Sequence, residues 1–177
     1  TTDIVVTRPE IYYGEMIEPS DIVFVGSPRG EFSYPAGEQN VRTVYEGKGG
    51  VPMGGFLRKL AFAIRFGEIN IMINNDITPE TRVMFHRQIV DRVRHITPFL
   101  TLDYDPYIIV HEGRLVWMID AYTTSASYPY SESSAGGLNY IRSVAKITID
   151  AYDGTVTYYQ IDETDPIVQT YAAIFPD

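Results

Sequence analysis

Two pairs of β-prone segments dominate the second half of the chain, and a tight glycine-containing turn joins the members of each pair. The first turn is His111–Arg114 and the second is Asp153-Gly154. Glycine adopts positive φ at little cost, and Asp-Gly is among the strongest short-range signals for a β-hairpin. The four segments are residues 107–110, 115–122, 144–152 and 155–161. The sequence therefore predicts a four-strand antiparallel meander made of two hairpins, from about Tyr107 to Ile161.

Alternation along the two middle strands separates an apolar face from a polar one. The apolar rows are Leu115, Trp117, Ile119 and Ala121 in one strand, and Ala145, Ile147, Ile149 and Ala151 in the other. Successive side chains of a strand point to opposite faces of the sheet, so each row shares one face. We expect these two rows to pack against helices.

Three segments have the marks of helices. Residues 79–97 follow a capping Thr78, have Pro79 in the first turn and stop at Thr97-Pro98. Residues 56–66 place an apolar stripe on one face before Gly67, and residues 165–174 begin with Asp165 as a cap. The stripe of the 79–97 helix is Phe85, Ile89, Val93 and Ile96, and that of the 56–66 helix is Leu57, Leu60, Ala61 and Ile64.

Residues 68–74 alternate Ile69, Ile71 and Ile73, which favours a strand without excluding a continued helix. The runs Ile4–Val6 and Ile22–Val25 indicate short strands near the N-terminus. The expected fold class is α+β, with the meander packed against two or three helices and preceded by short strands. A length of 177 residues and a hydrophobic content of 45% suit one domain.

Charge and composition exclude several classes of function. The net charge of -9 repels a phosphate backbone and an anionic membrane surface, so we expect no nucleic-acid partner. The absence of cysteine excludes a disulfide framework, a thiolate metal site and a cysteine nucleophile. No apolar run reaches the roughly 18 residues that a membrane-spanning helix needs.

Familiar cofactor and metal motifs are missing from the sequence. Lys48 is followed by Gly49 rather than Ser or Thr, so the glycine-rich stretch there does not match a P-loop. On one helix over residues 79–97, His86 and His95 would lie on opposite faces, because they are nine residues apart. We expect no metal and no cofactor.

The acidic residues offer one possible catalytic or calcium site. Asp103, Asp105 and Asp120 could act as an acid/base pair or bind a hard cation if the fold brings them together. Their ordinary interpretation is local, because Asp103 and Asp105 lie in a loop before Pro106 and Asp120 lies on the polar strand face.

The long polar connection after Tyr122 is the strongest candidate for a binding surface. It is far longer than the usual ~4 to 6 residues between elements, and such loops are often functional. Tyrosines provide rigid amphipathic contact area for protein or carbohydrate recognition, although they also anchor ordinary loops. The candidate binding residues are Asp120, Tyr122, Thr124, Tyr128, Tyr130, Asn139, Tyr140 and Arg142.

Seven stretches spread over the chain have a distinctive sequence: PEIYYGE, EFSYPAGEQN, YEGKGGVPM, RVRHITPFLTLDYDPY, WMIDAYTTSASYPYS, LNYIRSVAKITIDAYDGTVTYY and DPIVQTYAAIFPD. Together they resemble the uncharacterised protein family 0182, which consists of large bacterial multi-pass membrane proteins. The resemblance implies that residues 1–177 are a single extracytoplasmic domain of a longer protein in the cell membrane, with the membrane helices upstream. It implies no catalytic residues. A helix followed by strands with the DAYDGTV turn is also locally similar to PepSY-type modules.

Three functional hypotheses follow. The first is a non-catalytic extracytoplasmic domain that binds a protein or glycan of the cell envelope through the tyrosine-rich loop. The second is a carboxylate-based hydrolase or calcium-dependent module at the cell envelope that uses Asp103, Asp105 and Asp120. The third is a structural role as a spacer or an oligomer contact.

Overall fold

The computed structural model describes residues 5–28, 30–36 and 39–174, which form two separate units. One unit combines Thr1–Ile17 with Gln88–Asp177, and the other is Glu18–Arg87. Glu18–Arg87 contains a sheet and a hydrophobic core of its own. The single extracytoplasmic domain expected from the sequence stays a prediction.

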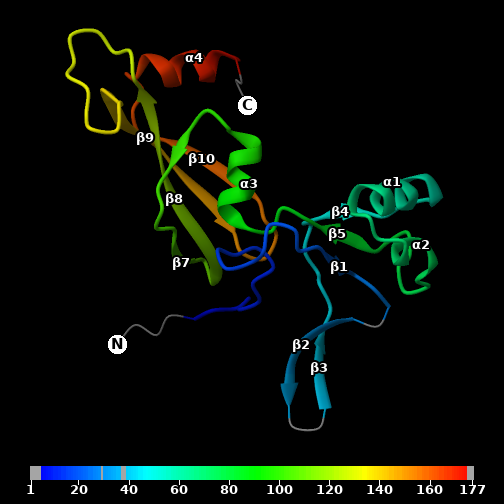
Figure 1. Cartoon of the computed structure of the whole chain (residues 1–177). Coiled ribbons are helices and arrows are strands. Elements are labelled where there is room, and N and C mark those ends of the chain that lie inside the picture. The colour runs from blue at the N-terminus through cyan, green and yellow to red at the C-terminus, as the bar shows by residue number, and fades with distance from the viewer. Residues whose placement is uncertain (1–4, 29, 37–38, 175–177) are drawn as a thin grey trace. The chain divides into compact units, whose positions relative to one another are not determined.

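The larger unit contains an antiparallel five-stranded sheet (Figure 1). Its strands are β6 (Thr101–Leu102), β7 (Tyr107–His111), β8 (Arg114–Ser125), β9 (Tyr140–Asp150) and β10 (Val156–Gln160). β8 pairs with β7 and β6 along one side and with β9 on the other, and β10 pairs with β9. The meander of two hairpins predicted from the sequence is confirmed, and β6 is an additional short strand.

The apolar rows of β8 and β9 face each other in register; the β9 row is buried, whereas in the β8 row Ile119 and Ala121 are buried and Leu115 and Trp117 are half-buried. Ile119 pairs with Ile147, and Ala121 pairs with Ala145. The helix α3 (Ile89–Ile96) lies against this unit's sheet and buries Ile89 completely (Figure 1). The prediction that these rows pack against a helix is confirmed for α3.

The predicted helix over residues 79–97 is wrong in its first half. The side chain of Gln88 caps α3 by accepting a hydrogen bond from the Asp91 backbone N–H at 2.6 Å, so the helix begins only at Ile89. Upstream, β5 (Arg82–Met84) takes part in a sheet, and His86 has φ 49, which interrupts any helix. Pairing of β5 with two neighbouring strands outweighs the local helical pattern, because it buries Val83 and Met84 completely.

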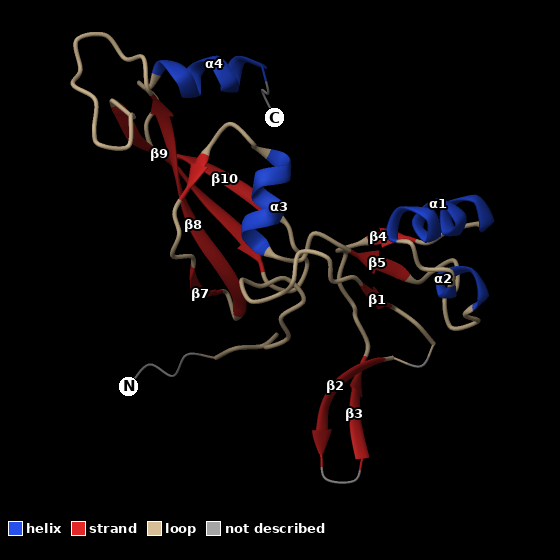
Figure 2. Ribbon diagram, viewed as in Figure 1, coloured by secondary structure: helices blue, strands red, loops and turns tan. Residues whose placement is uncertain are grey.

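The smaller unit combines a three-stranded antiparallel sheet with two helices (Figure 2). β5 lies between β1 (Val23–Val25) and β4 (Val51–Pro52), and the helices are α1 (Phe56–Phe66) and α2 (Asn70–Ile73). A separate hairpin pairs β2 (Glu31–Ala36) with β3 (Gln39–Thr43). The strand expected over residues 68–74 is the short helix α2, which buries Ile71 and leaves Ile69 and Ile73 exposed.

α1 is the helix predicted from residues 56–66, but it buries a different face from the predicted one. Phe62, Ala63 and Phe66 pack into the core with Phe85, whereas Leu57, Leu60, Ala61 and Ile64 are exposed. The packing of Phe62 and Phe66 is parallel, with ring centroids 5.7 Å apart. α1 therefore has a second apolar face that the described residues leave uncovered.

The helix predicted near the C-terminus is confirmed, but the short strand predicted near the N-terminus is not. α4 (Pro166–Ile174) follows Asp165, whose Oδ1 accepts hydrogen bonds from the backbone N–H groups of Ile167 and Val168 at 2.9 Å each. Near the other end Val5 and Val6 are not in a strand, and Ile4 lies outside the described residues. No helix among the described residues has the length and apolar character needed to cross a membrane.

Candidate functional site

The long connection between β8 and β9 is held in one conformation by Asn139. The Asn139 side chain accepts a hydrogen bond from the Tyr128 N–H at 2.9 Å and donates one to the Tyr128 carbonyl at 2.8 Å. It also donates to the Ser131 carbonyl at 3.3 Å, while the Ser131 hydroxyl donates to the Asn139 carbonyl at 2.7 Å. A single side chain thus ties the two ends of the loop together.

An aromatic stack connects this loop to the sheet. The rings of Tyr128 and Tyr140 are nearly parallel, at 12°, with centroids 4.4 Å apart. The Tyr140 hydroxyl donates a 2.5 Å hydrogen bond to Asp165 Oδ2, which also accepts one from the Thr123 hydroxyl at 3.0 Å. The structure therefore brings together Tyr128, Asn139 and Tyr140, three of the candidates from the sequence, and adds Asp165 beneath them.

Asp165 is a completely buried carboxylate that accepts hydrogen bonds both from the first turn of α4 and from side chains of β8 and β9. Burial raises the pKa of Asp165, but the hydrogen bonds from Tyr140, Thr123 and two backbone N–H groups outweigh it and lower the pKa overall. The pKa of Tyr140 is raised, chiefly by its hydrogen bond to Asp165. The ionised carboxylate thus fixes both the N-terminus of α4 and the base of the aromatic stack.

The outer surface of the loop presents apolar and aromatic side chains to solvent. Tyr130 is fully exposed and has φ 59, a left-handed conformation that is uncommon for a residue with a side chain. Tyr128 is 43% exposed despite its stack on Tyr140. Leu138 in the loop and Ile141 near the start of β9 are also exposed. Ile141 and Leu138 were not singled out from the sequence, because nothing in a single sequence shows which loop residues face solvent.

The remaining loop candidates have structural partners nearby. Arg142 forms an ion pair with Asp162 and donates a hydrogen bond to the Thr164 hydroxyl at 3.0 Å. The Thr124 and Thr101 hydroxyl oxygens lie 3.1 Å apart, which joins β8 to β6. These contacts support the frame of the loop.

Two of the acidic residues proposed as an alternative site are adjacent, because the Asp103 backbone N–H donates to the Asp120 carbonyl at 2.8 Å, but their side chains have different partners. The Tyr122 hydroxyl donates to Asp103 Oδ2 at 2.8 Å, and Lys146 Nζ lies 2.5 Å from Asp120 Oδ1. The pKa of Asp103 is lowered, first by the hydrogen bond from Tyr122. Asp105 donates its backbone N–H to Asp103 Oδ1 at 3.4 Å. A hydrolase or calcium site at these residues stays a prediction.

The Asp153-Gly154 turn and the residues just before it contact three other segments of the larger unit. Arg114 contacts both Asp150 and Asp153, and the Arg92 Nε donates to the Gly154 carbonyl at 2.8 Å. The N–H groups of Tyr12 and Tyr13 donate to the Ala151 carbonyl at 2.8 and 2.9 Å. These groups hold the N-terminal segment, α3 and the sheet together.

A cavity in the same unit was not foreseen from the sequence. Its volume is about 370 Å³ and its walls are mostly apolar. The hydroxyl groups of Thr97 and Tyr158 lie 3.2 Å apart, and burial raises the pKa of Tyr158. The walls are formed by α3 and the residues after it, β9, β10 and α4: Ile96, Thr97, Phe99, Leu100, Val144, Ala145, Tyr158, Gln160, Val168, Tyr171 and Ala172.

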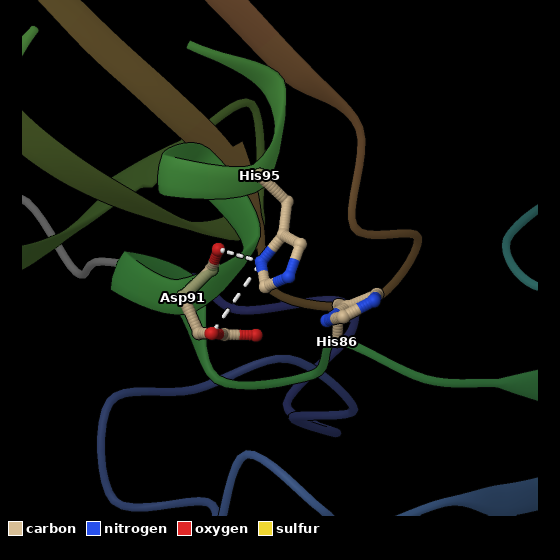
Figure 3. A group of neighbouring side chains, drawn as sticks. All are labelled: His86, Asp91 and His95. Carbon is tan, nitrogen blue, oxygen red and sulfur yellow. Dashed lines mark hydrogen bonds and ion pairs between the residues drawn. The ribbon is translucent and has the colours of Figure 1, made fainter. Parts of the chain in front are cut away.

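The histidines differ from their expected arrangement. Figure 3 shows His95 on α3, with its Nδ1 2.8 Å from the Asp91 backbone oxygen and 3.4 Å from Asp91 Oδ1. His86 precedes α3 and belongs to the other unit, where its ring meets Phe85 edge-on at 5.3 Å. The expectation that both histidines lie on opposite faces of one helix is therefore wrong, because His86 is not in a helix.

Comparison with known proteins agrees with the resemblance found in the sequence. The model of the uncharacterised protein family UPF0182 matches residues 1–177. UPF0182 proteins of Alkaliphilus metalliredigens and Geobacter sp. strain M21 are each 49% identical to the chain, over 178 and 175 residues. The Moorella thermoacetica UPF0182 protein is also 49% identical, over 173 residues.

These alignments include 100%, 98% and 97% of this chain respectively, but only 19% of each relative. The chain thus spans about a fifth of the length of the relatives it matches. No solved structure matches the chain. Since the family model extends over all 177 residues, the chain belongs to the uncharacterised protein family UPF0182.

Proposed function

We propose that this chain is a non-catalytic extracytoplasmic binding domain that recognises a protein or glycan of the cell envelope through the β8–β9 loop. The observation that carries the proposal is the fully exposed Tyr130 on a loop that Asn139 holds closed. A loop whose backbone is held before binding loses little conformational freedom on binding, which favours affinity.

The neighbouring side chains support the same assignment. The ring of Tyr128 stacks on the ring of Tyr140, which restrains it and leaves its other face exposed. Leu138 and Ile141 add apolar contact area near the loop ends. Binding surfaces commonly combine a few rigid aromatic anchors with surrounding apolar area and a polar rim.

A site-specific photo-crosslinker tests this role because it captures whichever molecule lies against the loop. Benzoylphenylalanine replaces Tyr130 in the full-length protein in cells, and adducts are identified after illumination. The matched control is Tyr104, which is 90% exposed in the same unit but lies outside the loop. We expect an adduct specific to position 130 that weakens when Tyr128 is changed to alanine. Equal labelling at both positions, or none at position 130, contradicts the proposal.

Binding of a glycan by the loop is tested by a separate measurement. The chain and its Tyr130→Ala variant are applied to an array of bacterial envelope polysaccharides, with Tyr104→Ala as control. Loss of a hot-spot tyrosine lowers affinity by roughly 2 kcal/mol or more, which is about thirtyfold. Binding that is equal for all three chains excludes the loop as the glycan site.

The extracytoplasmic setting is part of the proposal and rests on the family resemblance. The relatives are long enough to hold further segments, because this chain matches only 19% of each. Reporter enzymes fused after residue 177 of the full-length protein test the location: alkaline phosphatase is active only outside the cytoplasm. An inactive phosphatase fusion together with a fluorescent cytoplasmic reporter at the same position contradicts it.

A further inference from the structure

Six large apolar side chains on and around α1 and α2 are exposed, although the helices have a well-packed core beneath them. Leu57 is 80% exposed and Ile64 is 74% exposed. The set, which we call the α1–α2 apolar face, is Phe56, Leu57, Leu60, Ile64, Ile69 and Ile73. Scattered single apolar residues on a surface need no explanation, but a group of this size marks an interaction site.

The side chains that anchor α1 lie on its opposite face. Phe62 and Phe66 stack on each other and pack against Phe85, with centroid distances of 6.2 and 5.9 Å to that ring. Ala63 is buried in the same core. The exposed side chains are therefore not required to hold α1 in place.

Basic residues border the α1–α2 apolar face. At ~100° per residue, Arg58 and Arg65 fall on the same side of α1, between the exposed stripe and the buried face. Both are exposed, whereas Lys59 lies on the buried side of the helix, where its Nζ donates to the Ile77 carbonyl. α1 contains no acidic residue.

The charge of the smaller unit differs from that of the rest of the chain. Between Glu18 and Arg87 eight acidic and eight basic residues balance, so the whole net charge of -9 falls on the other unit. The repulsion from anionic surfaces expected from the total charge therefore does not apply to the unit that contains α1. Cations beside an apolar helix face complement the phosphates and the acyl-chain boundary of an anionic bilayer.

We propose that the α1–α2 apolar face binds the interface of an anionic lipid bilayer. Phe56, Leu57 and Ile64 enter the boundary between headgroups and acyl chains. The arginines extend their apolar stems along the same boundary and place their guanidinium groups at the phosphates. A bilayer accepts such a face without a matching pocket, which suits an exposed row of aliphatic side chains.

Cosedimentation of the chain with lipid vesicles tests this binding. One set of vesicles contains equal parts of phosphatidylglycerol and phosphatidylcholine, and the other contains phosphatidylcholine alone. We expect binding to the anionic vesicles that weakens with added salt. In the Leu57→Ser/Ile64→Ser double variant the partition coefficient falls at least about tenfold, because the lost methyl and methylene groups no longer leave water.

Two matched controls separate the contributions of the face. Ile161→Ser removes an exposed aliphatic side chain from the larger unit and leaves vesicle binding unchanged. Arg58→Gln and Arg65→Gln each lower binding to anionic vesicles about fivefold, whereas Arg94→Gln on α3 does not. Circular dichroism confirms that each variant is folded.

Three results overturn the inference. The wild-type chain stays in the supernatant with both kinds of vesicle, or the Leu57→Ser/Ile64→Ser variant binds as well as the wild type. In the third, the wild-type chain does not bind vesicles, and analytical ultracentrifugation shows that it forms a dimer that the double variant does not form. That result would mean that the face joins two copies of the chain. The loop variant Tyr130→Ala should bind vesicles to the same extent as the wild type, so failure here is distinct from failure of the proposed function.

Discussion

Arg114 holds the Asp150 carboxylate with two hydrogen bonds, from Nε to Oδ2 at 2.7 Å and from Nη2 to Oδ1 at 2.9 Å. The same guanidinium reaches Asp153 Oδ2 at 2.8 Å. Its fixed planar fork allows this two-point contact, which a lysine cannot reproduce. Arg114 begins β8 and Asp150 ends β9, so the contact joins a strand end to the Asp153-Gly154 turn.

Replacing Arg114 with glutamine should lower the free energy of unfolding of the larger unit by about 1–2 kcal/mol. This value lies between the typical contribution of an exposed ion pair and that of a charge-assisted hydrogen bond, because the Arg114 side chain is partly exposed. Urea unfolding measured by tryptophan fluorescence reports the change, since Trp117 lies in β8. Arg94→Gln, an exposed change on α3, is the control and should have little effect. An unchanged urea midpoint for Arg114→Gln shows that the contact is not stabilising.

Gly154→Ala should be more destabilising than Gly137→Ala, although both positions have positive φ. At Gly154, with φ 69, an added Cβ would lie 2.5 Å from the Tyr13 ring. At Gly137, with φ 82, nothing lies within 4 Å of that position. Backbone strain of about 1 kcal/mol applies to both, and the clash adds about 1–3 kcal/mol at Gly154. Equal unfolding midpoints for the two variants show that Tyr13 moves away freely.

Stability of the larger unit should fall in acid as Asp165 takes up a proton. Its folded pKa is lowered, so its contribution is fully present above the unfolded value of about 3.9. The contribution is lost as the pH falls from that value through the folded pKa. Urea unfolding across this pH range should show a shallower loss of stability in Asp165→Asn than in the wild type.

Glu132→Gln, in the exposed loop, is the matched control and should retain the wild-type pH dependence. The Asn side chain keeps the capping oxygen, so Asp165→Asn should still form α4. If the wild type and Asp165→Asn have parallel pH profiles, the buried carboxylate is not the titrating group.

Asn139→Ala should loosen the β8–β9 loop without a large change in global stability. The variant loses the three hydrogen bonds that join Asn139 to Tyr128 and Ser131, all of which lie at the protein surface. Hydrogen exchange of the Tyr128 amide should accelerate at least about tenfold, because the N–H loses its partner. Ser131→Ala keeps the Asn139 side chain and should leave that amide protected. Unchanged exchange in Asn139→Ala shows that the loop is held by other contacts.

Tyr122→Phe should raise the pKa of Asp103 toward its ordinary value. The hydrogen bond from Tyr122 stabilises the ionised carboxylate and is the main reason that its pKa is lowered. A carbon-13 NMR titration of the side-chain carboxyl group measures the change. Tyr107→Phe, in the neighbouring strand β7, serves as control. An unaltered Asp103 titration in Tyr122→Phe shows that backbone N–H groups alone hold the carboxylate.

Local sequence determined the parts of this fold whose stabilising contacts are close in the chain. The two hairpins follow from alternating side chains and glycine turns, and Asp165 could be recognised as the α4 cap, because its acceptor meets N–H groups two and three residues ahead. The loop was recognised by its length and its tyrosines. The family resemblance was equally present in the residues themselves.

Only the tertiary structure decided which of two plausible patterns prevailed elsewhere. Residues 82–84 join a sheet rather than a helix because β1 and β4 lie on both sides of them, and neither neighbour is local in sequence. In the smaller unit Phe62 and Phe66 of α1 face the core and Leu57 and Ile64 face solvent, because the two aromatic rings pack against Phe85. Periodicity identifies an apolar face, but burial depends on what the rest of the chain brings to it.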